Sequence, residues 1–258
     1  MSRPSIVLSS ACFFPDTEGA FRRAAEHGYD GVELMVNHDR RSQTVETVNE
    51  LSQTYGVVVR SVHVPCLVIS QHVWGWNPEV KLRRSVEMAR SVGADVVVVH
   101  PPFRWQREYA EAFSALVDEL HEAEDGPAVT VENMYSVDAL GRAVRPYLGS
   151  DDAAFAAYPA ITLDTSHAAA DRRDVLELYE LWRGSLRHLH VSDSTAKRGD
   201  EHLPPGAGVL PLDELGRQAR RDGFAGHVVL EVGLGRLPET DRDAAAAACR
   251  EWAAAAFG

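Results

Sequence analysis

Short apolar runs rich in β-branched residues alternate along the chain with longer stretches whose apolar residues recur every three or four positions. Eight short runs predict strands: Ser5–Ser9, Gly31–Val36, Val57–His63, Asp95–His100, Ala128–Glu132, Ile161–Asp164, Leu186–Val191 and His227–Glu231. The longer stretches predict amphipathic helices and include Thr17–His27, Val45–Tyr55, Val80–Val92, Glu108–Ala123, Val137–Leu148 and Leu212–Asp222. The Ala-rich end, with Ala244–Ala248 and Ala253–Ala256, predicts a final helix packed closely on its neighbours.

Eight strand–helix pairs predict an α/β fold, a single (β/α)8 TIM barrel. Such barrels run to ~250 residues as one unit, and the chain has 258 residues, so we expect one domain over residues 1–258. A doubly wound open sheet could use the same elements. It usually carries a Gly-rich phosphate turn after its first strand, which Ser9-Ser10-Ala11-Cys12 does not supply. The segment 150–159 is expected to be a surface loop before the sixth strand.

The composition is ordinary for a chain that buries a large core, with 45% hydrophobic and 25% charged residues. The formal net charge of −12 provides no positive field that would attract a polyanion, which argues against a nucleic-acid partner. Acidic residues that bind metal ions would offset part of this charge. The argument from charge is therefore a modest one.

The three cysteines, Cys12, Cys66 and Cys249, are far apart and show no CxxC spacing. Neither a disulfide framework nor a cysteine zinc site is expected. The N-terminal segment has too short an apolar run for a signal peptide, and no stretch approaches the ~18 residues of a membrane span. These features predict a cytoplasmic protein without a membrane partner.

Ionisable side chains stand at the ends of six predicted strands. They are His63, His100, Glu132, Asp164 followed by His167, His190 followed by Asp193, and Glu231. In a (β/α)8 barrel these positions lie at one end, where functional groups gather. A buried charge is costly unless it is paired or metal-bound. Because carboxylate and imidazole ligands together suit zinc, manganese or a similar ion, the sequence predicts a divalent metal site.

Four of these residues, Glu132, Asp164, His190 and Glu231, are the predicted metal ligands. Three carboxylates facing one another inside a barrel mouth repel strongly unless a cation lies between them. The imidazole of His190 completes a mixed set of four ligands. A purely structural role explains such a set less well than a bound ion does.

The remaining polar residues have alternative explanations. His63 and His100, taken singly, could be structural histidines bonded to a backbone carbonyl. His188 alternates with His190 and lies deeper in its strand, so it is expected to pack beneath the site or to orient a ligand. Asp193 could bind a metal or cap the loop after its strand, and a supporting role beside the ligands is favoured.

Several aromatic and amide residues follow the third to fifth strands. Asn133, Tyr135, Trp74, Trp76 and Trp105 could line a substrate pocket, although aromatic residues there could equally cover the barrel. Substrate specificity is expected to depend on these loops.

The strand-end motifs resemble the xylose isomerase-like barrel superfamily, which holds sugar isomerases and epimerases, inosose dehydratases and the endonuclease IV group. The motifs are VHVP at 62–65, VVVHPP at 97–102, VEN at 131–133, LDTSHA at 163–168, HVSDS at 190–194, GDEHLPPGAG at 199–208 and LEVG at 230–233. The resemblance spans nearly the whole chain.

The resemblance to the isomerases and epimerases implies one manganese, cobalt, zinc or similar ion. Its ligands would be Glu132, Asp164, His190 and Glu231. Glu132 and Glu231 would also form the acid–base pair: one removes a proton beside a carbonyl, the metal stabilises the enediolate, and the other returns a proton. His167 and His63 would then contact substrate hydroxyls. The implied substrate is a polyhydroxy or phosphorylated small molecule, such as a sugar, sugar phosphate or cyclitol.

The resemblance to the endonuclease IV group implies instead three zinc ions held by nine side chains. Residues of the same types here are His63, His100, Glu132, Asp164, His167, His190, Asp200, His202 and Glu231. The spacings Asp164-x-x-His167 and Asp200-x-His202 look like that group's signatures. A trinuclear cluster would bind a phosphate ester and generate hydroxide, which is hydrolytic chemistry.

Asp200 is the discriminating residue, because several of the others also occur in superfamily members assigned to sugar chemistry. Against DNA repair stand the acidic charge, the absence of an evident DNA-penetrating loop, and Ala207 where that group usually carries an acid. The leading prediction is therefore a metal-dependent isomerase or epimerase. The alternative is a trinuclear zinc phosphoesterase acting on a small phosphoester or abasic DNA. Two further functions are considered: dehydratase or lyase chemistry, and an inactive barrel that serves as a binding module. Family analogy also suggests a homodimer.

Overall fold

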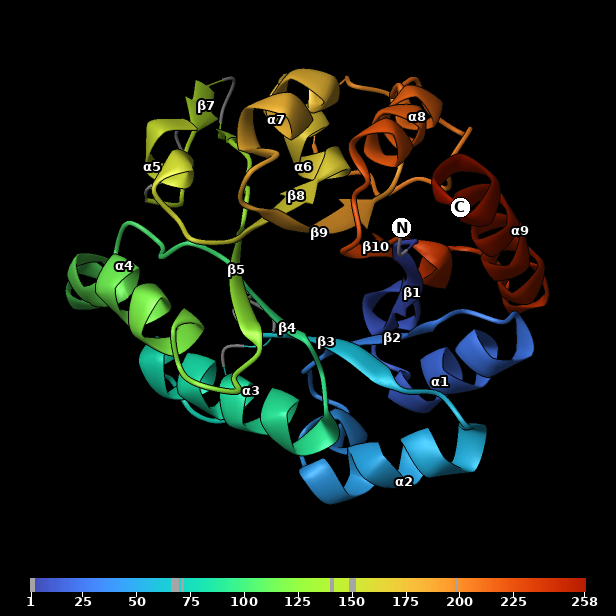
Figure 1. The fold of residues 1–258 in the computed structure, drawn as a ribbon, viewed down its shortest axis with the longest axis horizontal. Coiled ribbons are helices and arrows are strands. Elements are labelled where there is room, and N and C mark those ends of the chain that lie inside the picture. The colour runs from blue at the N-terminus through green and yellow to red at the C-terminus, as the bar shows by residue number, and fades with distance from the viewer. Residues whose placement is uncertain (1–2, 66–69, 71, 140–141, 149–151, 198) are drawn as a thin grey trace.

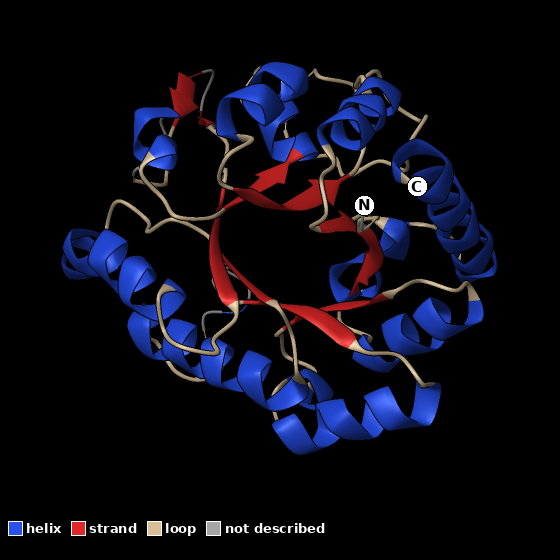
Figure 2. Ribbon diagram, in the orientation of Figure 1, coloured by secondary structure: helices blue, strands red, loops and turns tan. Residues whose placement is uncertain are grey.

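Eight parallel strands close into a barrel at the centre of the molecule, with helices around it (Figures 1 and 2). The computed structural model describes residues 3–258 except 66–69, 71, 140–141, 149–151 and 198. The barrel strands are β1 Ser5–Ser9, β2 Gly31–Met35, β3 Val59–His63, β4 Val96–Val99, β5 Ala128–Glu132, β8 Ile161–Asp164, β9 Leu186–Val191 and β10 His227–Leu230. They neighbour one another in the order β1-β10-β9-β8-β5-β4-β3-β2, which confirms the predicted (β/α)8 barrel.

The helices cover the outside of the barrel (Figure 2). They are α1 Thr17–Glu26, α2 Val45–Tyr55, α3 Pro78–Val92, α4 Arg107–His121, α5 Asp152–Ala156, α6 Thr165–Ala170, α7 Val175–Trp182, α8 Leu212–Asp222 and α9 Glu239–Phe257, with 3-10 turns η1 Ser10–Phe13, η2 Arg40–Ser42 and η4 Leu234–Arg236. Helix α3 begins where the Asn77 side chain accepts hydrogen bonds from the backbone N–H groups of Glu79 and Val80. It ends at Gly93, whose φ of 73° is a left-handed conformation that favours glycine.

The helix expected over Val137–Leu148 is wrong. The structure has there an antiparallel pair of strands, β6 Val137–Ala139 and β7 Arg142–Val144, in which Val137 pairs with Val144. In the sequence, Gly141 lies inside the expected helix, where a glycine costs roughly 0.5–1 kcal/mol relative to alanine. The apolar spacing outweighed this signal in our prediction.

The segment 150–159, expected to be a surface loop, contains the short helix α5. Phe155 is 1% exposed and stacks on Trp182 of α7, with ring centroids 5.1 Å apart. It also meets Tyr158 edge-on at 5.6 Å. This packing against α7, which the local sequence pattern does not reveal, holds the segment against the body of the protein.

Side chains on each barrel strand alternate between the helix layer and the barrel interior. On β8, Ile161 and Leu163 belong to the apolar core shared with the helices. Thr162 points the other way, into the barrel, and its hydroxyl lies 2.7 Å from that of Thr130 on the neighbouring strand β5. The apolar core therefore lies outside the barrel, whereas polar side chains occupy much of its inside.

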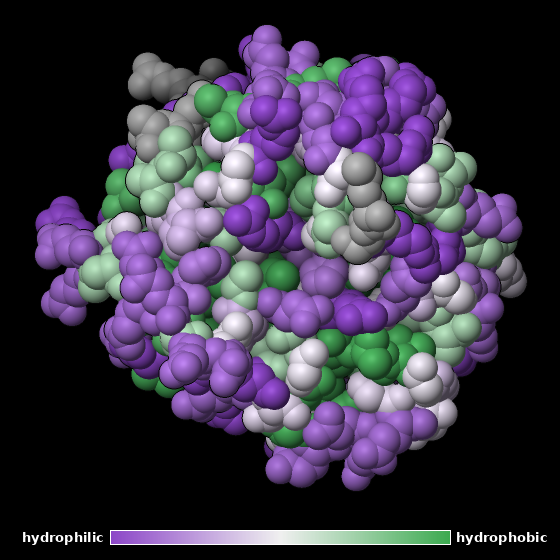
Figure 3. Space-filling model, viewed as in Figure 1, coloured by the Kyte–Doolittle hydropathy of each residue, from purple (hydrophilic) through white to green (hydrophobic). Residues whose placement is uncertain are grey.

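On the face seen in Figure 3, hydrophilic side chains cover most of the surface and apolar ones form small separate areas. Within the described part of the chain, no helix has the length and apolar character needed to cross a membrane.

Candidate metal centre

Glu132, the last residue of β5, lies at the centre of a group of imidazoles. Its Oε2 is 3.2 Å from His63 Nε2 and 2.9 Å from His100 Nε2. Its Oε1 is 3.0 Å from His190 Nδ1 and 3.4 Å from His167 Nδ1. The Glu132 side chain is only 1% exposed. One buried carboxylate thus joins two sets of histidines, one through each oxygen.

Three carboxylates converge on the Nδ1 atom of His190, which lies on β9. This nitrogen is 2.7 Å from Glu231 Oε2, 3.0 Å from Glu132 Oε1 and 3.8 Å from Asp164 Oδ2. The parallel register of the barrel explains the arrangement, because Asp164 pairs with His190 between β8 and β9. The carboxylates come from β5, from the end of β8 and from the residue that follows β10.

Asp164 is fixed in place although one of its oxygens has no hydrogen bond. Its Oδ1 accepts a hydrogen bond from the His167 backbone N–H at 2.7 Å and thereby caps α6. Its backbone is tied to the Asn133 side chain by two hydrogen bonds, of 2.7 and 3.0 Å. Asp164 Oδ2 is buried and has no hydrogen-bond partner among the described residues. A buried carboxylate oxygen left without a donor is costly and suits a cation ligand.

Asp200 and His202 reach the same region from the loop that follows β9. Asp200 Oδ2 is 2.8 Å from His202 Nε2 and 3.5 Å from His167 Nε2. Ser166 Oγ donates to Asp200 Oδ1 at 2.6 Å. Asp200, His202 and His167 therefore form a third set of candidate ligands beside the first two.

Asp193 fastens the loop that carries Asp200 and His202. Its two oxygens accept hydrogen bonds of 2.8 to 3.0 Å from the backbone N–H groups of Ser194, Gly206, Gly208 and Leu210. A Cβ added at Gly208 would lie 2.4 Å from Asp193 Oδ1. These contacts give Asp193 the role of capping the loop, whereas the sequence favoured a supporting role beside the metal ligands.

The donor set fits a divalent cation. Ligand atoms of Glu132, Asp164, His190 and Glu231 all lie within 4.8 Å of one another, and the same holds for His63 with His100 and Glu132 and for Asp164 with His167 and His202. Imidazole and carboxylate without thiolate suit zinc, manganese or cobalt. The nine residues named from the sequence are therefore gathered at one end of the barrel, in three adjoining sets.

Electrostatics also favour a cation at this position. Burial would raise the pKa of Glu132, but the His190 and His100 imidazoles outweigh it and hold that pKa well below its usual value. For His190 burial lowers the pKa, yet Glu33, Glu231 and Glu132 raise it well above the usual value. Burial dominates for Asp164 and raises its pKa. Protons on the imidazoles thus balance the carboxylates, and a metal ion would replace those protons.

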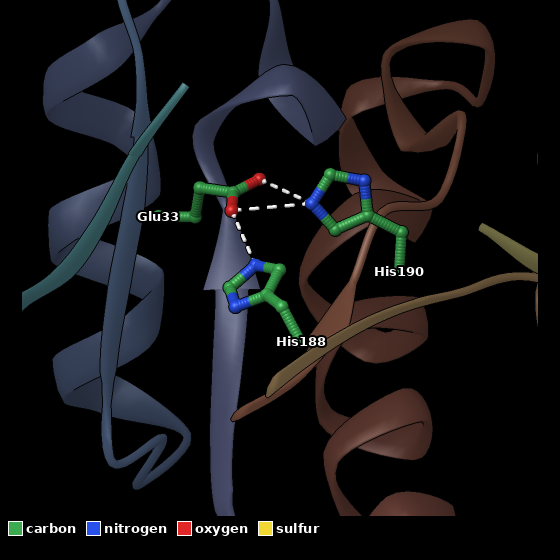
Figure 4. A group of neighbouring side chains, drawn as sticks. All are labelled: Glu33, His188 and His190. Carbon is green, nitrogen blue, oxygen red and sulfur yellow. Dashed lines mark hydrogen bonds and ion pairs between the residues drawn. The ribbon is translucent and has the colours of Figure 1, made fainter. Parts of the chain in front are cut away.

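Glu33 is a site residue that the sequence interpretation missed. It lies on β2, is fully buried, and contacts both His188 and His190 (Figure 4). Its Oε2 is 2.8 Å from His188 Nε2, and its Oε1 is 3.1 Å from His190 Nε2. The available signal was a lone acidic residue inside the apolar run Gly31–Met35. His188 lies beneath the carboxylate group, as expected from its depth in the strand.

A cavity of about 570 Å³ adjoins the candidate metal centre, and His100 contributes to its wall. Trp76 and Trp105 line it and are 67% and 62% exposed. Tyr135 lies beside the candidate metal centre and not along this cavity, with its ring 4.8 Å from that of His167. Trp74 Nε1 donates to the Gln43 carbonyl, and the Arg84 guanidinium covers its ring. Of the aromatic residues considered, Trp76 and Trp105 are thus lining residues of this cavity.

Comparison with known proteins agrees with the barrel fold. A sequence profile described as xylose isomerase-like TIM barrel matches residues 21–255. An uncharacterized protein of Mycobacterium tuberculosis is 44% identical over 252 residues, which cover 89% of this chain and 90% of that protein.

More distant relatives carry names of sugar-converting enzymes. Fructoselysine 3-epimerase of Shigella flexneri is 24% identical over 248 residues, 83% of this chain and 84% of that enzyme. The crystal structure of a D-tagatose 3-epimerase-like protein superposes with a TM-score of 0.73 at 19% identity, covering 98% of both chains. At this identity the structural match shows the fold alone.

Proposed function

The chain belongs to the xylose isomerase-like TIM barrel family, and we propose that it is a divalent-metal-dependent isomerase or epimerase of a sugar, sugar phosphate or cyclitol. The observation that carries the proposal is the convergence of Glu132, Glu231 and Asp164 on one nitrogen of His190. Relatives whose names give their activity, such as fructoselysine 3-epimerase, support the same class of reaction.

The proposed metal ligands are Glu132, Asp164, His190 and Glu231. When bound, a divalent ion would supply Lewis-acid stabilisation of negative charge on the substrate oxygens. The protein contributes the geometry of these groups. Asn133 fixes Asp164, and the backbone of β9 fixes His190.

Glu231 and Glu132 are the proposed acid–base pair. The side chain of Glu231 is 16% exposed at the barrel mouth, whereas that of Glu132 is 1% exposed and lies deeper. The pKa of Glu231 is lowered, because His190 and His202 outweigh the effect of burial. Glu231 is therefore ionised at neutral pH and accessible, as a base that removes a proton beside a carbonyl must be. His167 and His63 remain the proposed contacts for substrate hydroxyls.

Solvent deuterium exchange into a panel of ketoses tests this proposal. The wild-type protein with manganese, cobalt or zinc should incorporate deuterium at the carbon beside the carbonyl of at least one sugar. Glu231→Gln and Glu132→Gln should abolish the exchange, whereas Glu251→Gln on the exposed face of α9 should not change it. Exchange that persists in both site variants would contradict the acid–base assignment.

A second candidate function, phosphoester hydrolysis by a trinuclear zinc centre, is favoured by one specific observation. The two oxygens of Glu132 face different sets of histidines, and Asp200 adds a third set with His167 and His202. A carboxylate in this position could join two cations. The substrate of such a centre would be a small phosphoester or abasic DNA.

The metal content per chain separates the two candidates. About three zinc ions per chain would contradict the single-metal epimerase, and one ion would remove the trinuclear hydrolase. Cleavage of a phosphodiester or an abasic duplex that is lost in Asp200→Ala would support hydrolysis directly. Ketose exchange retained in Asp200→Ala would support the epimerase.

A further inference from the structure

Glu33 is surrounded by hydrogen-bond donors on every side that the structure describes. Ser61 Oγ and His188 Nε2 lie 2.8 Å from Oε2, Ser9 Oγ lies 3.3 Å from Oε1, and His190 Nε2 lies 3.1 and 3.2 Å from the two oxygens. The strand register creates this arrangement, because Glu33 pairs with Ser9 on β1 and with Ser61 on β3. Four donors satisfy the acceptor capacity of one ionised carboxylate.

These contacts determine the role of each nitrogen of His190. A carboxylate is an acceptor only, so His190 must carry a hydrogen on Nε2, the atom that faces Glu33. The opposite nitrogen, Nδ1, faces Glu132, Glu231 and Asp164. Histidines that bind metals commonly donate their other N–H to a carboxylate, which fixes the ring and makes the ligating nitrogen more basic.

We propose that Glu33 is a positioning residue that holds His190 with Nε2–H toward β2 and Nδ1 toward the carboxylates at the barrel mouth. Glu33 does not itself bind an ion, because its four donors leave no lone pair for one. His188 supports Glu33 from below as another donor (Figure 4). This inference rests on the proposed metal site but not on the identity of the substrate.

The test measures metal binding and the His190 ring, without using activity. Glu33→Leu removes the acceptor with a similar side-chain volume and should weaken zinc affinity by roughly 10- to 100-fold in chelator competition. Glu33→Gln keeps a carbonyl oxygen and should recover part of that loss. Ser9→Ala is the control and should change affinity by less than about threefold, because it removes two long hydrogen bonds of 3.3 Å, the one to Glu33 Oε1 and the one that Ser9 Oγ accepts from the Ala11 N–H.

Nuclear magnetic resonance of the zinc-loaded wild-type protein provides a reading that does not depend on whether the variants fold. His190 should show a slowly exchanging, downfield Nε2–H proton. A hydrogen on Nδ1 instead would overturn the proposal. It would also be overturned if Glu33→Leu and His188→Gln each lowered the metal content by one ion per chain, since Glu33, His188 and His190 would then themselves hold an ion.

A second inference concerns the 570 Å³ cavity and rests on different residues. Trp105 stacks on Phe103 with centroids 4.3 Å apart and an interplanar angle of 8°, and Phe103 stacks on Tyr147 at 4.6 Å. Tyr147 in turn meets His100 edge-on at 6.0 Å. A continuous series of rings thus leads from the candidate metal centre to an exposed tryptophan.

The cavity has the size and surface of a binding site for a hydroxylated ring. Its volume falls within the ~300–1,000 Å³ range typical of small-molecule sites. Phe103 covers one face of Trp105, while 62% of the Trp105 surface remains exposed. Gln106, Arg107 and Glu108 add polar groups to the wall. Aromatic faces bind the C–H faces of sugar rings, and the polar groups can bind their hydroxyls.

We infer that this cavity binds a second sugar ring, so that the substrate is a glycosylated ketose and not a free monosaccharide. The inference rests on the proposed epimerase or isomerase function, because the first ring must lie at Glu132 and Glu231. His100 lines the cavity and contacts Glu132, which makes the two regions continuous.

Lactulose, a disaccharide of galactose and fructose, is the probe, and fructose is the comparison. Deuterium exchange should have a higher kcat/KM for lactulose than for fructose. Trp105→Ala should lower the lactulose value by about 3- to 10-fold, the size expected of one stacking contact, and leave fructose unchanged. Leu181→Ala, an exposed apolar residue on α7, is the matched control and should change neither.

The outcomes separate the two claims. Equal exchange into both sugars, or no effect of Trp105→Ala, would overturn the second-ring site and leave the epimerase intact. Calorimetric binding of lactulose that depends on Trp105, without exchange into either sugar, would overturn the proposed reaction and retain the site. If lactulose neither exchanges nor binds, the second-ring site is wrong.

Discussion

The two sides of the same barrel strands carry opposite chemistry. Toward the helices, β8 presents Ile161 and Leu163, both fully buried in the apolar core. Toward the interior it presents Thr162 and Asp164, also fully buried. Barrel interiors of this fold are usually filled by layers of branched apolar side chains. On this strand the side that faces the helices stabilises the fold, whereas the interior side carries polar groups whose burial is unfavourable unless it is compensated.

The difference follows from the energetics of burial. Each apolar side chain removed from water stabilises the fold by about 1.5–3 kcal/mol, whereas a buried carboxylate is unfavourable unless donors or a cation compensate it. Glu33 has four donors, while Asp164 Oδ2 has none among the described residues. Donors thus compensate the Glu33 carboxylate, whereas the Asp164 oxygen at the barrel mouth keeps acceptor capacity for a ligand.

The largest expected effect is on activity and comes from the interior. Glu132→Gln should lower the ketose exchange rate by about 10²- to 10⁴-fold, the usual contribution of a general acid or base. Its thermal midpoint without metal should fall little, because the glutamine keeps a carbonyl oxygen that accepts a hydrogen bond from a neighbouring imidazole. The measurement pairs exchange kinetics with thermal unfolding of the metal-free protein. A stability loss as large as that of a core truncation would remove the contrast between the two sides.

Leu163→Ala tests the opposite side of the same strand. Truncating this fully buried leucine should cost about 2–5 kcal/mol of unfolding free energy. Zinc affinity of the protein that remains folded should change by less than threefold, because the neighbouring Asp164 keeps its backbone hydrogen bonds. Urea unfolding and chelator competition measure the two quantities. Strongly weakened zinc binding would show that the two sides are coupled.

Asp164→Asn should separate metal binding from stability at a single residue. Without metal, the variant should be more stable by about 1–2 kcal/mol, since it loses a buried charge that lacks a donor. Zinc affinity should fall by at least tenfold. The same urea and chelator experiments apply. A metal-free variant less stable than the wild type would indicate that Asp164 is already compensated by its neighbours.

The smallest effect at neutral pH is expected at the far end of the interior, where the change appears only on acidification. Burial lowers the pKa of His227 to about 3, with His188 and Arg60 also lowering it. Between pH ~6.5 and 3 the unfolded chain binds a proton there that the folded protein does not, so stability falls as the pH falls. His227→Phe should reduce the slope of unfolding free energy against pH by up to about 1.4 kcal/mol per pH unit. An unchanged slope between pH 4 and 6 would show that His227 is protonated in the folded state.

The sequence pattern predicted most of the fold. The observed strand boundaries lie within two residues of those expected, and α2 and α8 begin and end where predicted. Hydrophobic periodicity is a local property, so neighbouring residues suffice to predict a strand or an amphipathic helix. The failure at Val137–Leu148 occurred where turn chemistry outweighed that periodicity. At 150–159 the helix depends on packing against α7, which the local pattern does not reveal.

The candidate site was predictable only in part. Strand-end positions such as Glu132, Asp164 and Glu231 were recognisable, because any parallel barrel gathers the ends of its strands at one face. Glu33 was not, since its importance depends on facing His188 and His190 from β2, on a strand that does not neighbour β9 in the barrel. The role of Asp193 as an anchor for the Asp200 loop likewise depends on contacts up to seventeen residues away.

The sequence by itself therefore determined which side chains reach the barrel mouth and which line the apolar layer, because strand alternation assigns each residue to one side. Tertiary structure alone decided which groups meet: that one nitrogen of His190 faces Glu33 and the other faces three carboxylates. The physical reason is that contact across a barrel depends on its closure and strand register, which bring together residues far apart in the sequence. Those distances set the charge balance at which a cation would bind.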